Sequence, residues 1–238
     1  MKKAIIIGST SGIGRELAKL LTEHGYCVGI AGRREEELEK LRSELPDKFF
    51  VRRMDIAEPE SAVKILEELV TEMQGLDLLV VSAGVGHVNP ELSWKKEKET
   101  IDVNVSGFTA IADAGMLHFL KQGRGHLVGI SSIAAFRGGA ESPAYNASKA
   151  YVSNYLEGLR FKAGKSGMPI SVAEIIPGFV DTNMAKSENL FWVAPVRKAA
   201  LQIFKAIRKK KARAYITKRW RIIAWLLKLL PDFICQKM

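Results

Sequence analysis

The sequence is poor in cysteine, in histidine and in long apolar runs. Cys27 and Cys235 are its two cysteines, and they lie too far apart for a disulfide framework or a metal-binding motif. Of the four histidines, His118 and His126 have no ligand partners at metal spacing, so we expect no metal. The N-terminal apolar run, within MKKAIIIGST, is far shorter than a signal-peptide core. A reducing cytoplasm is therefore the expected location.

Acidic residues are scarce near the C-terminus, and the chain has a formal net charge of +10. After Pro195 almost every charge is positive. These cations are Arg197, Lys198, Lys205, Arg208 to Lys211, Arg213, Lys218, Arg219, Arg221 and Lys228. An anionic membrane surface or an acidic ligand could use this field, and a solvated basic face explains it equally well. Nucleic acid is not the expected partner, because the chain lacks an aromatic–basic platform or a known reader motif.

A glycine-rich turn follows the first apolar run. Ala4 to Ile7 lead into GSTSGIG, and apolar residues at helical spacing come next. A strand, a glycine turn and a helix together are typical of dinucleotide binding, since the backbone can approach a pyrophosphate at the helix N-terminus. A purely structural strand–helix turn is the alternative. The predicted cofactor contacts here are Gly8, Ser9, Thr10, Ser11, Gly12, Ile13 and Gly14.

A tyrosine and a lysine lie one helical turn apart in the segment AYNASKAYVSNYLEGL. The pair is Tyr145 and Lys149, whose side chains project from the same helix face. An ammonium beside a phenol favours the phenolate, so we expect a lowered pKa for Tyr145 and proton exchange near neutral pH. Ser132, thirteen positions upstream, supplies a hydroxyl for a carbonyl or alcohol oxygen. Such a pair taken by itself is common in helices.

Taken together with the glycine turn, these residues resemble the short-chain dehydrogenase/reductase family from residue 2 to about residue 217. The resemblance implies a catalytic set of Asn104, Ser132, Tyr145 and Lys149, in which Asn104 supports a water in a proton relay. The family spacing selects Ser132 over Ser131. The implied activity is reversible hydride transfer between a nicotinamide cofactor and a ketone or aldehyde on one side and an alcohol on the other. A non-catalytic regulatory or scaffold protein that binds NADPH is the rival hypothesis.

The cofactor preference is predicted from the end of the second strand. An NAD site needs a carboxylate there, but Gly32 stands at that position and Arg33 and Arg34 follow it. A guanidinium suits a 2′-phosphate, by charge and by bidentate geometry. We therefore expect NADP(H) rather than NAD(H). The alternative is that both arginines pair with the acidic residues 35–37 of the next helix.

The resemblance implies further cofactor contacts at the ends of other strands, and it includes Asn104, Tyr145 and Lys149 among them. The others are Asp55 and Ile56, then Ser82, Ala83 and Gly84, and finally Pro177, Gly178, Val180 and Thr182. The family usually has Asn where this chain has Ser82, and Thr where it has Ile7. His87 is a candidate for the substrate mouth.

Short apolar runs alternate with amphipathic segments throughout the chain, without a linker or a repeat. This pattern predicts a single-domain α/β fold with a Rossmann-like, doubly wound parallel sheet of about seven strands and helices on both faces. The domain is expected to span residues 1–217 and to include a substrate lid at 183–195. Phe191 and Trp192 in that lid favour an apolar or lipid-like substrate, and a surface for a partner would look the same.

Residues 218–238 form a basic, amphipathic tail. Arg221, Ala224 and Lys228 make one narrow stripe of the predicted helix, and apolar residues cover the rest. The run is shorter than the roughly 20 residues that span a bilayer. Its tryptophans and cations suit peripheral membrane contact through 218–234, at the inner membrane face, whereas packing on the substrate pocket or a second subunit is the alternative. The family resemblance implies a homodimer or homotetramer.

Overall fold

A computed structural model describes residues 1–44, 49–182, 191–231 and 234. Within these residues, seven strands form one sheet in the order β3-β2-β1-β4-β5-β6-β7, and every neighbouring pair is parallel. The strands are β1 (Lys3–Ile7), β2 (Cys27–Gly32), β3 (Phe49–Arg53), β4 (Leu78–Val81), β5 (Gly125–Ile130), β6 (Ile170–Pro177) and β7 (Arg213–Ile216). The predicted doubly wound parallel sheet is confirmed.

Helices lie between the strands, and one more follows the last strand. They are α1 (Gly12–Glu23), α2 (Glu35–Ser43), α3 (Pro59–Glu72), α4 (Trp94–Ile101), α5 (Phe108–Gln122), α6 (Pro143–Lys165), α7 (Val196–Arg208) and α8 (Trp220–Leu229). A π-helix, Asp102–Gly107, joins α4 to α5, and a short 3-10 helix, Ile133–Phe136, follows β5.

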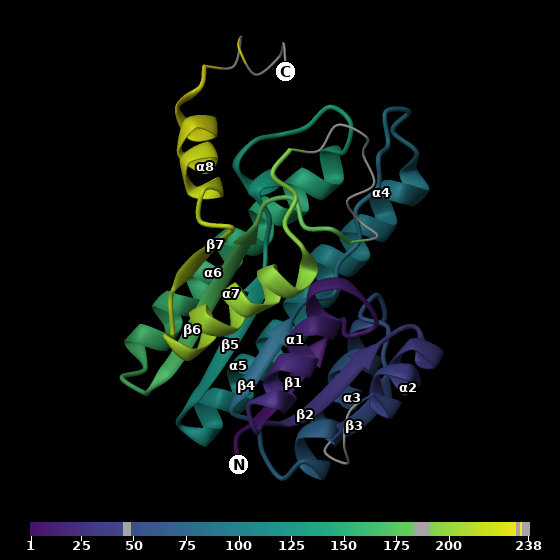
Figure 1. The fold of residues 1–238 in the computed structure, drawn as a ribbon, viewed down its shortest axis with the longest axis vertical. Coiled ribbons are helices and arrows are strands. Elements are labelled where there is room, and N and C mark those ends of the chain that lie inside the picture. The colour runs from purple at the N-terminus through teal and green to yellow at the C-terminus, as the bar shows by residue number, and fades with distance from the viewer. Residues whose placement is uncertain (45–48, 183–190, 232–233, 235–238) are drawn as a thin grey trace.

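Two apolar cores cover the two faces of the sheet. Successive strand residues point to opposite faces, so Ile6 packs with α1, α2 and α7, whereas Ile5 and Ile7 pack with α3, α5 and α6. Figure 1 shows these helical layers on either side of the strands. Because both faces are covered, the central strands are almost entirely apolar.

The last helix, α8, lies outside the two layers. It stands beyond the carboxyl ends of the strands, at the opposite end of the molecule from the N-terminus (Figure 1). A third, smaller core of Ile133, Trp220 and Ala224 joins it to the 3-10 helix after β5. Across the described ranges, every helix is too short or too polar to cross a bilayer.

Candidate active site at the carboxyl edge of the sheet

The glycine turn is shaped by close backbone contacts. Gly8 has a φ of +91°, and a Cβ built on it would lie 2.4 Å from the Ala83 nitrogen. A Cβ on Gly14 would lie 2.1 Å from the Gly8 carbonyl oxygen. The amides of Ser82 and Ala83 both donate to the Ile7 oxygen, at 2.8 and 2.9 Å. Side chains at Gly8 and Gly14 are thus excluded, and Ser82 and Ala83 are joined to β1 through their backbone.

The N-terminus of α1, which follows the turn, is suited to binding an anion. Ser11 precedes the helix, makes no side-chain capping hydrogen bond, and no acidic residue lies in the first turn. The first amide groups of a helix lack intrahelical partners, and the helix dipole favours negative charge there. The sequence Gly12-Ile13-Gly14 therefore fits a pyrophosphate.

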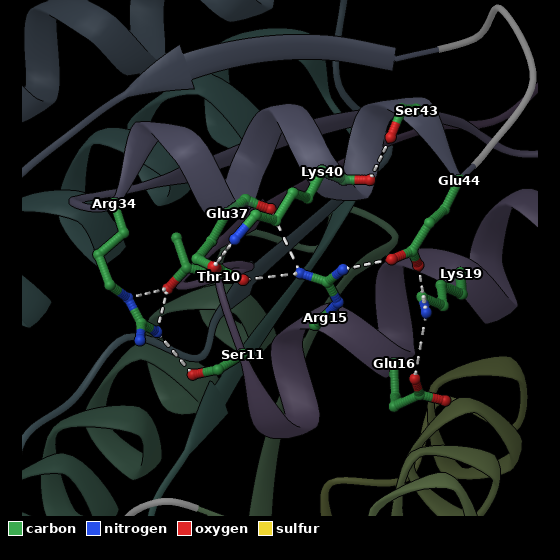
Figure 2. A network of polar contacts seen from close by, with 10 residues as sticks. All are labelled: Thr10, Ser11, Arg15, Glu16, Lys19, Arg34, Glu37, Lys40, Ser43 and Glu44. Carbon is green, nitrogen blue, oxygen red and sulfur yellow. Dashed lines mark hydrogen bonds and ion pairs between the residues drawn. The ribbon is translucent and has the colours of Figure 1, made fainter.

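Arg34 is hydrogen-bonded across the glycine turn (Figure 2). Its Nη2 donates to Thr10 Oγ1 at 2.6 Å and to Ser11 Oγ at 2.8 Å, and its Nε donates to Thr10 Oγ1 at 3.2 Å. Thr10 in turn fills the space beside Gly32, where an added Cβ would lie 2.7 Å from Thr10 Cγ2. An acidic side chain at position 32 is therefore sterically excluded unless Thr10 moves.

The alternative partners considered for the two arginines are not the ones observed. Arg33 makes an ion pair with Glu99 of α4, at 3.4 Å. Glu37 instead pairs with Lys40 at 2.8 Å and with Arg15 of α1 at 3.4 Å (Figure 2). The Arg34 guanidinium thus remains beside the turn rather than on its own helix.

Tyr145 and Lys149 lie on one face of α6, as predicted. Lys149 Nζ lies over the Tyr145 ring, 5.7 Å from its centroid, and donates to the Ile130 carbonyl oxygen at 3.1 Å. The lysine is 6% exposed, and burial lowers its pKa to about 8.

The expected lowering of the Tyr145 pKa by Lys149 is wrong in this structure. Burial raises the pKa of Tyr145, and the hydrogen bond with Ser132 opposes that rise. The physical reason is that a buried phenolate loses its solvation, while the ammonium faces the ring.

The two neighbouring serines have different environments. Ser131 Oγ donates to the buried Glu174 carboxylate at 2.9 Å, and Glu174 also pairs with Arg213 at 2.8 Å. Ser132 begins the 3-10 helix, where its Oγ accepts from the Ala134 amide at 3.1 Å, and it is hydrogen-bonded to Tyr145. The structure therefore brings Ser132, and not Ser131, to the tyrosine.

Asn104 is buried in the π-helix between α4 and α5. Its Oδ1 accepts from the Val85 amide at 2.9 Å, while its Nδ2 donates to the Val85 carbonyl at 2.7 Å and to Ser148 Oγ at 3.0 Å. A Cβ on Gly84 would lie 3.2 Å from Asn104 Oδ1 and 3.3 Å from Lys149 Nζ. The Asn104 side chain thus braces the segment after β4 beside the lysine.

A model of the short chain dehydrogenase family matches residues 2–191. The chain belongs to the short-chain dehydrogenase family of oxidoreductases. An uncharacterized oxidoreductase of Myxococcus xanthus is 36% identical over 193 residues, which cover 79% of this chain and 76% of the relative. An uncharacterized oxidoreductase of Staphylococcus aureus is 33% identical over 191 residues, which cover 79% of this chain and 82% of that relative.

Solved structures show the same fold at low sequence identity. A short-chain dehydrogenase/reductase of Burkholderia phymatum in complex with NAD aligns with a TM-score of 0.84 at 21% identity, covering 94% of this chain and 92% of its own. A short-chain dehydrogenase of Sphingobium yanoikuyae in complex with NADPH aligns with a TM-score of 0.82 at 21% identity, covering 97% of both chains.

The remaining predicted contacts of this short-chain dehydrogenase follow β3 and β6. Asp55 accepts from the Ala57 amide at 3.0 Å, and the Ile56 oxygen lies so close to Gly107 that a Cβ there would be 2.0 Å away. Thr182 reaches the glycine turn, since a Cβ on Gly12 would lie 3.1 Å from Thr182 Cγ2. The parallel strands thus bring all these segments to one edge of the sheet.

The predicted substrate lid is described from Phe191 onward, and its residues 183–190 lie outside the described residues. Val180 bridges to Ala194, and Gly178 packs on Trp220 so tightly that an added Cβ would lie 2.0 Å from the indole. Aromatic rings pack together here, with centroids 5.2 to 6.0 Å apart: Phe179, Phe191, Trp192 and Trp220. The predicted lid and the tail therefore share one aromatic cluster.

Sequence reasoning missed several residues that shape this site. Ser148, between Tyr145 and Lys149 in sequence, receives the Asn104 hydrogen bond, and its spacing on the helix could have revealed it. Glu99 bridges Arg33 and His87, with a His87 Nε2 to Glu99 Oε2 distance of 3.0 Å. The candidate substrate-mouth residue His87 therefore pairs with a carboxylate on α4. No signal in the sequence indicates this pairing.

A groove of 480 Å³ lies nearby, on another face of α6. It is lined by Ala135, Phe136, Arg137, Gly138, Gly139, Pro143, Asn146, Ala147 and Ala150, and none of the predicted catalytic residues is among them. No group of three or more histidine, cysteine or acidic residues is placed for a metal ion within the part of the chain that the structure describes.

Proposed function

We propose that this short-chain dehydrogenase interconverts a ketone or aldehyde and an alcohol, with NADP(H) as the hydride carrier. The single observation that carries the proposal is the convergence of Ser132, Tyr145 and Lys149. The serine hydroxyl is hydrogen-bonded to the tyrosine, and the lysine ammonium lies over the tyrosine ring. A phenol of this kind, backed by a buried cation, suits proton transfer to and from a substrate oxygen.

The residues at the carboxyl edge fit a dinucleotide. The uncapped N-terminus of α1 and the turn Gly8–Gly14 would hold the pyrophosphate. Asp55 and Ile56 would contact the adenine, Ser82, Ala83 and Gly84 would lie along the cofactor, and the Pro177–Thr182 segment would meet the nicotinamide end. Lys149 would bond the nicotinamide ribose.

The preference for NADP(H) over NAD(H) is argued from charge and shape. Solved relatives of this fold carry either NAD or NADPH, so the fold does not decide between them. Gly32 leaves no carboxylate beside the ribose, and Thr10 excludes one. Arg34, held on Thr10 and Ser11, and Arg33 provide two guanidinium groups for a 2′-phosphate.

The protein groups have separate roles in the proposed reaction. The bound nicotinamide supplies or accepts the hydride. In the reductive direction Tyr145 donates a proton to the carbonyl oxygen, and in the oxidative direction it removes that proton from the alcohol. Ser132 positions and polarises the same oxygen through its hydroxyl. Asn104 would support the relay water toward Lys149.

An apolar carbonyl substrate is the second part of the proposal. Phe191 and Trp192 pack on Phe179 and Trp220 beside the Gly178 loop. Aromatic side chains at that place favour an apolar substrate through the surface they remove from water.

We also propose a homodimer or homotetramer in the cytoplasm. Leu117 of α5 and Phe161 of α6 are 64% and 63% exposed, and these helices are neighbours in one layer. Large exposed apolar side chains on adjacent helices suit a subunit contact.

The test is NADPH oxidation with ketones graded from short polar to long apolar chains. We expect turnover to rise with chain length. Turnover confined to short polar carbonyls would remove the apolar-substrate part of the proposal. Binding of NADPH without turnover on any carbonyl would favour the non-catalytic hypothesis instead.

A further inference from the structure

The outer face of α8 is apolar and exposed. The inner face packs on the protein through Trp220 and Ala224, each 2% exposed, so Ala224 belongs to the packed face and not to the polar stripe expected from the sequence. Four outward side chains are between 43% and 63% exposed: Ile222, Trp225, Leu226 and Leu229. Packing of the helix on the rest of the protein therefore explains one face and leaves the other in solvent.

The described end of the lid extends this apolar face. Phe191 is 51% exposed and Trp192 is 43% exposed, yet their rings lie only 5.2 and 6.0 Å from the ring of Trp220 at the start of α8. We define the tail surface as Phe191, Trp192, Ile222, Trp225, Leu226 and Leu229. It combines two indoles and four other apolar side chains from two separate segments.

The tail surface is held in place by contacts at both ends of α8. At the C-terminal end, Arg137 donates to the carbonyl oxygens of Leu227, at 2.6 Å, and of Leu230. Cations suit these last carbonyls because the helix dipole is negative there. At the N-terminal end, the Arg219 guanidinium lies over the Trp192 ring, 4.8 Å from its centroid. The surface is therefore preorganised.

The charges on α8 and in the sequence that flanks it have one sign. No acidic residue occurs in the sequence between Glu188 and Asp232. Lys218, Arg219, Arg221 and Lys228 are exposed on and around α8. The run 208–211 lies elsewhere, because it precedes β7 whereas α8 follows that strand.

We propose that the tail surface docks on an anionic lipid bilayer. Tryptophans are favoured at the level of the lipid headgroups, leucine and isoleucine favour the adjoining hydrocarbon, and flanking cations attract anionic lipids. This proposal concerns binding and does not depend on the proposed reaction.

The test is co-sedimentation of the full chain with vesicles of phosphatidylcholine, either pure or mixed with phosphatidylglycerol. We expect sedimentation with the mixed vesicles, and much less with pure phosphatidylcholine or at high salt. The double variant Trp225→Ser/Leu229→Ser should bind about tenfold more weakly or worse, since it removes apolar side chains from the bilayer contact. Val88→Ser/Leu92→Ser, which alters side chains 60% and 64% exposed elsewhere, should bind like the wild type.

Two double variants test whether the positive charge beside the tail surface is required for binding. Lys218→Glu/Arg221→Glu should weaken binding about tenfold or more, whereas Lys209→Glu/Lys211→Glu, with the same change in net charge, should have a much smaller effect. Equal losses from both pairs would contradict docking through this surface, as would wild-type protein that stays in the supernatant. Light scattering without lipid tests whether a second copy of the chain, rather than a bilayer, covers the tail surface. If Trp225→Ser/Leu229→Ser splits an oligomer, a second copy covers the surface and the proposal is wrong.

Discussion

Arg34 and Thr10 are joined by a 2.6 Å hydrogen bond from Nη2 to Oγ1, which ties the end of β2 to the glycine turn. The threonine methyl group also occupies the space beside Gly32. Thr10 therefore narrows the space beside Gly32 and holds the Arg34 guanidinium beside the glycine turn.

Replacement of Arg34 by Ala should weaken NADPH binding about tenfold or more and leave NADH binding nearly unchanged. The reason is that only NADPH carries the 2′-phosphate that Arg34 would bind, and each charge-assisted hydrogen bond to it contributes on the order of 1.5–3 kcal/mol. Cofactor titration by fluorescence measures both dissociation constants, and Arg33→Asp is expected to discriminate in the same direction. Thr10→Val serves as the control for loss of the local hydrogen bond. Equal weakening of both cofactors by Arg34→Ala would overturn the assignment.

Substitutions of the neighbouring serines Ser131 and Ser132 should differ in their effect on turnover. Ser132→Ala should lower turnover about a hundredfold or more, because Ser132 contacts the tyrosine, and should lower the free energy of unfolding by about 0.5–1.5 kcal/mol through the lost hydrogen bond to the Ala134 amide. Ser131→Ala should lower the free energy of unfolding by about 1–3 kcal/mol and preserve turnover, because it removes a hydrogen bond from the buried Glu174. Kinetics and thermal melts of both variants check this, and the reverse pattern would assign the catalytic hydroxyl to Ser131.

Lys149→Met should abolish turnover and stabilise the fold. Burial lowers the pKa of Lys149 to about 8, so at pH 7 the folded chain holds a buried charge whose desolvation costs free energy. We expect the variant to gain about 1–3 kcal/mol at pH 7, less the lost hydrogen bond to Ile130.

The same shift fixes the sign of the pH dependence. Between pH 8 and the ordinary pKa of 10.5, the unfolded chain binds this proton more strongly than the folded one. Wild-type stability from this group therefore rises with pH in that window, and the advantage of Lys149→Met should shrink. Denaturant unfolding at several pH values measures the difference, with Lys162→Met, on an exposed position of the same helix, as control. A constant difference would show that the lysine charge is not the cause.

His126 should make the fold sensitive to mild acid. Burial, with a smaller contribution from the Lys210 charge, lowers the pKa of His126 to about 4. Between pH 6.5 and 4 the unfolded chain is then protonated at this position and the folded chain is not, so stability falls as pH falls, by up to about 3 kcal/mol. His126→Phe should flatten this part of the stability profile. A variant that keeps the full acid slope would exclude His126 as its source.

Much of the fold could be predicted from the sequence because its signals are local. Apolar runs bounded by glycine gave the strands, and the alternation of strands and helices gave the parallel sheet. The segments that follow the strands, including 82–84 and 177–182, meet at one edge because parallel strands end there.

The details that were missed depend on contacts between distant segments. The sequence allows Arg34 to pair with the acidic residues 35–37 of the next helix. Its observed partners, Thr10 and Ser11, lie more than twenty positions away. The direction of the Tyr145 pKa shift depends on burial and on where the lysine points. The spacing of the two residues in the sequence shows neither. Likewise, Ala224 looked like part of a polar stripe, but the position of the 3-10 helix after β5 decides which face of α8 is packed.

Tyr145 is the proton donor in the proposed carbonyl reduction. NADPH oxidation with a carbonyl substrate, compared between the wild type and Tyr145→Phe, tests this role, and NADPH binding by both proteins is measured beside it. We expect the variant to bind NADPH as tightly as the wild type and to lose at least about a hundredfold in turnover. Turnover retained by Tyr145→Phe would contradict this role.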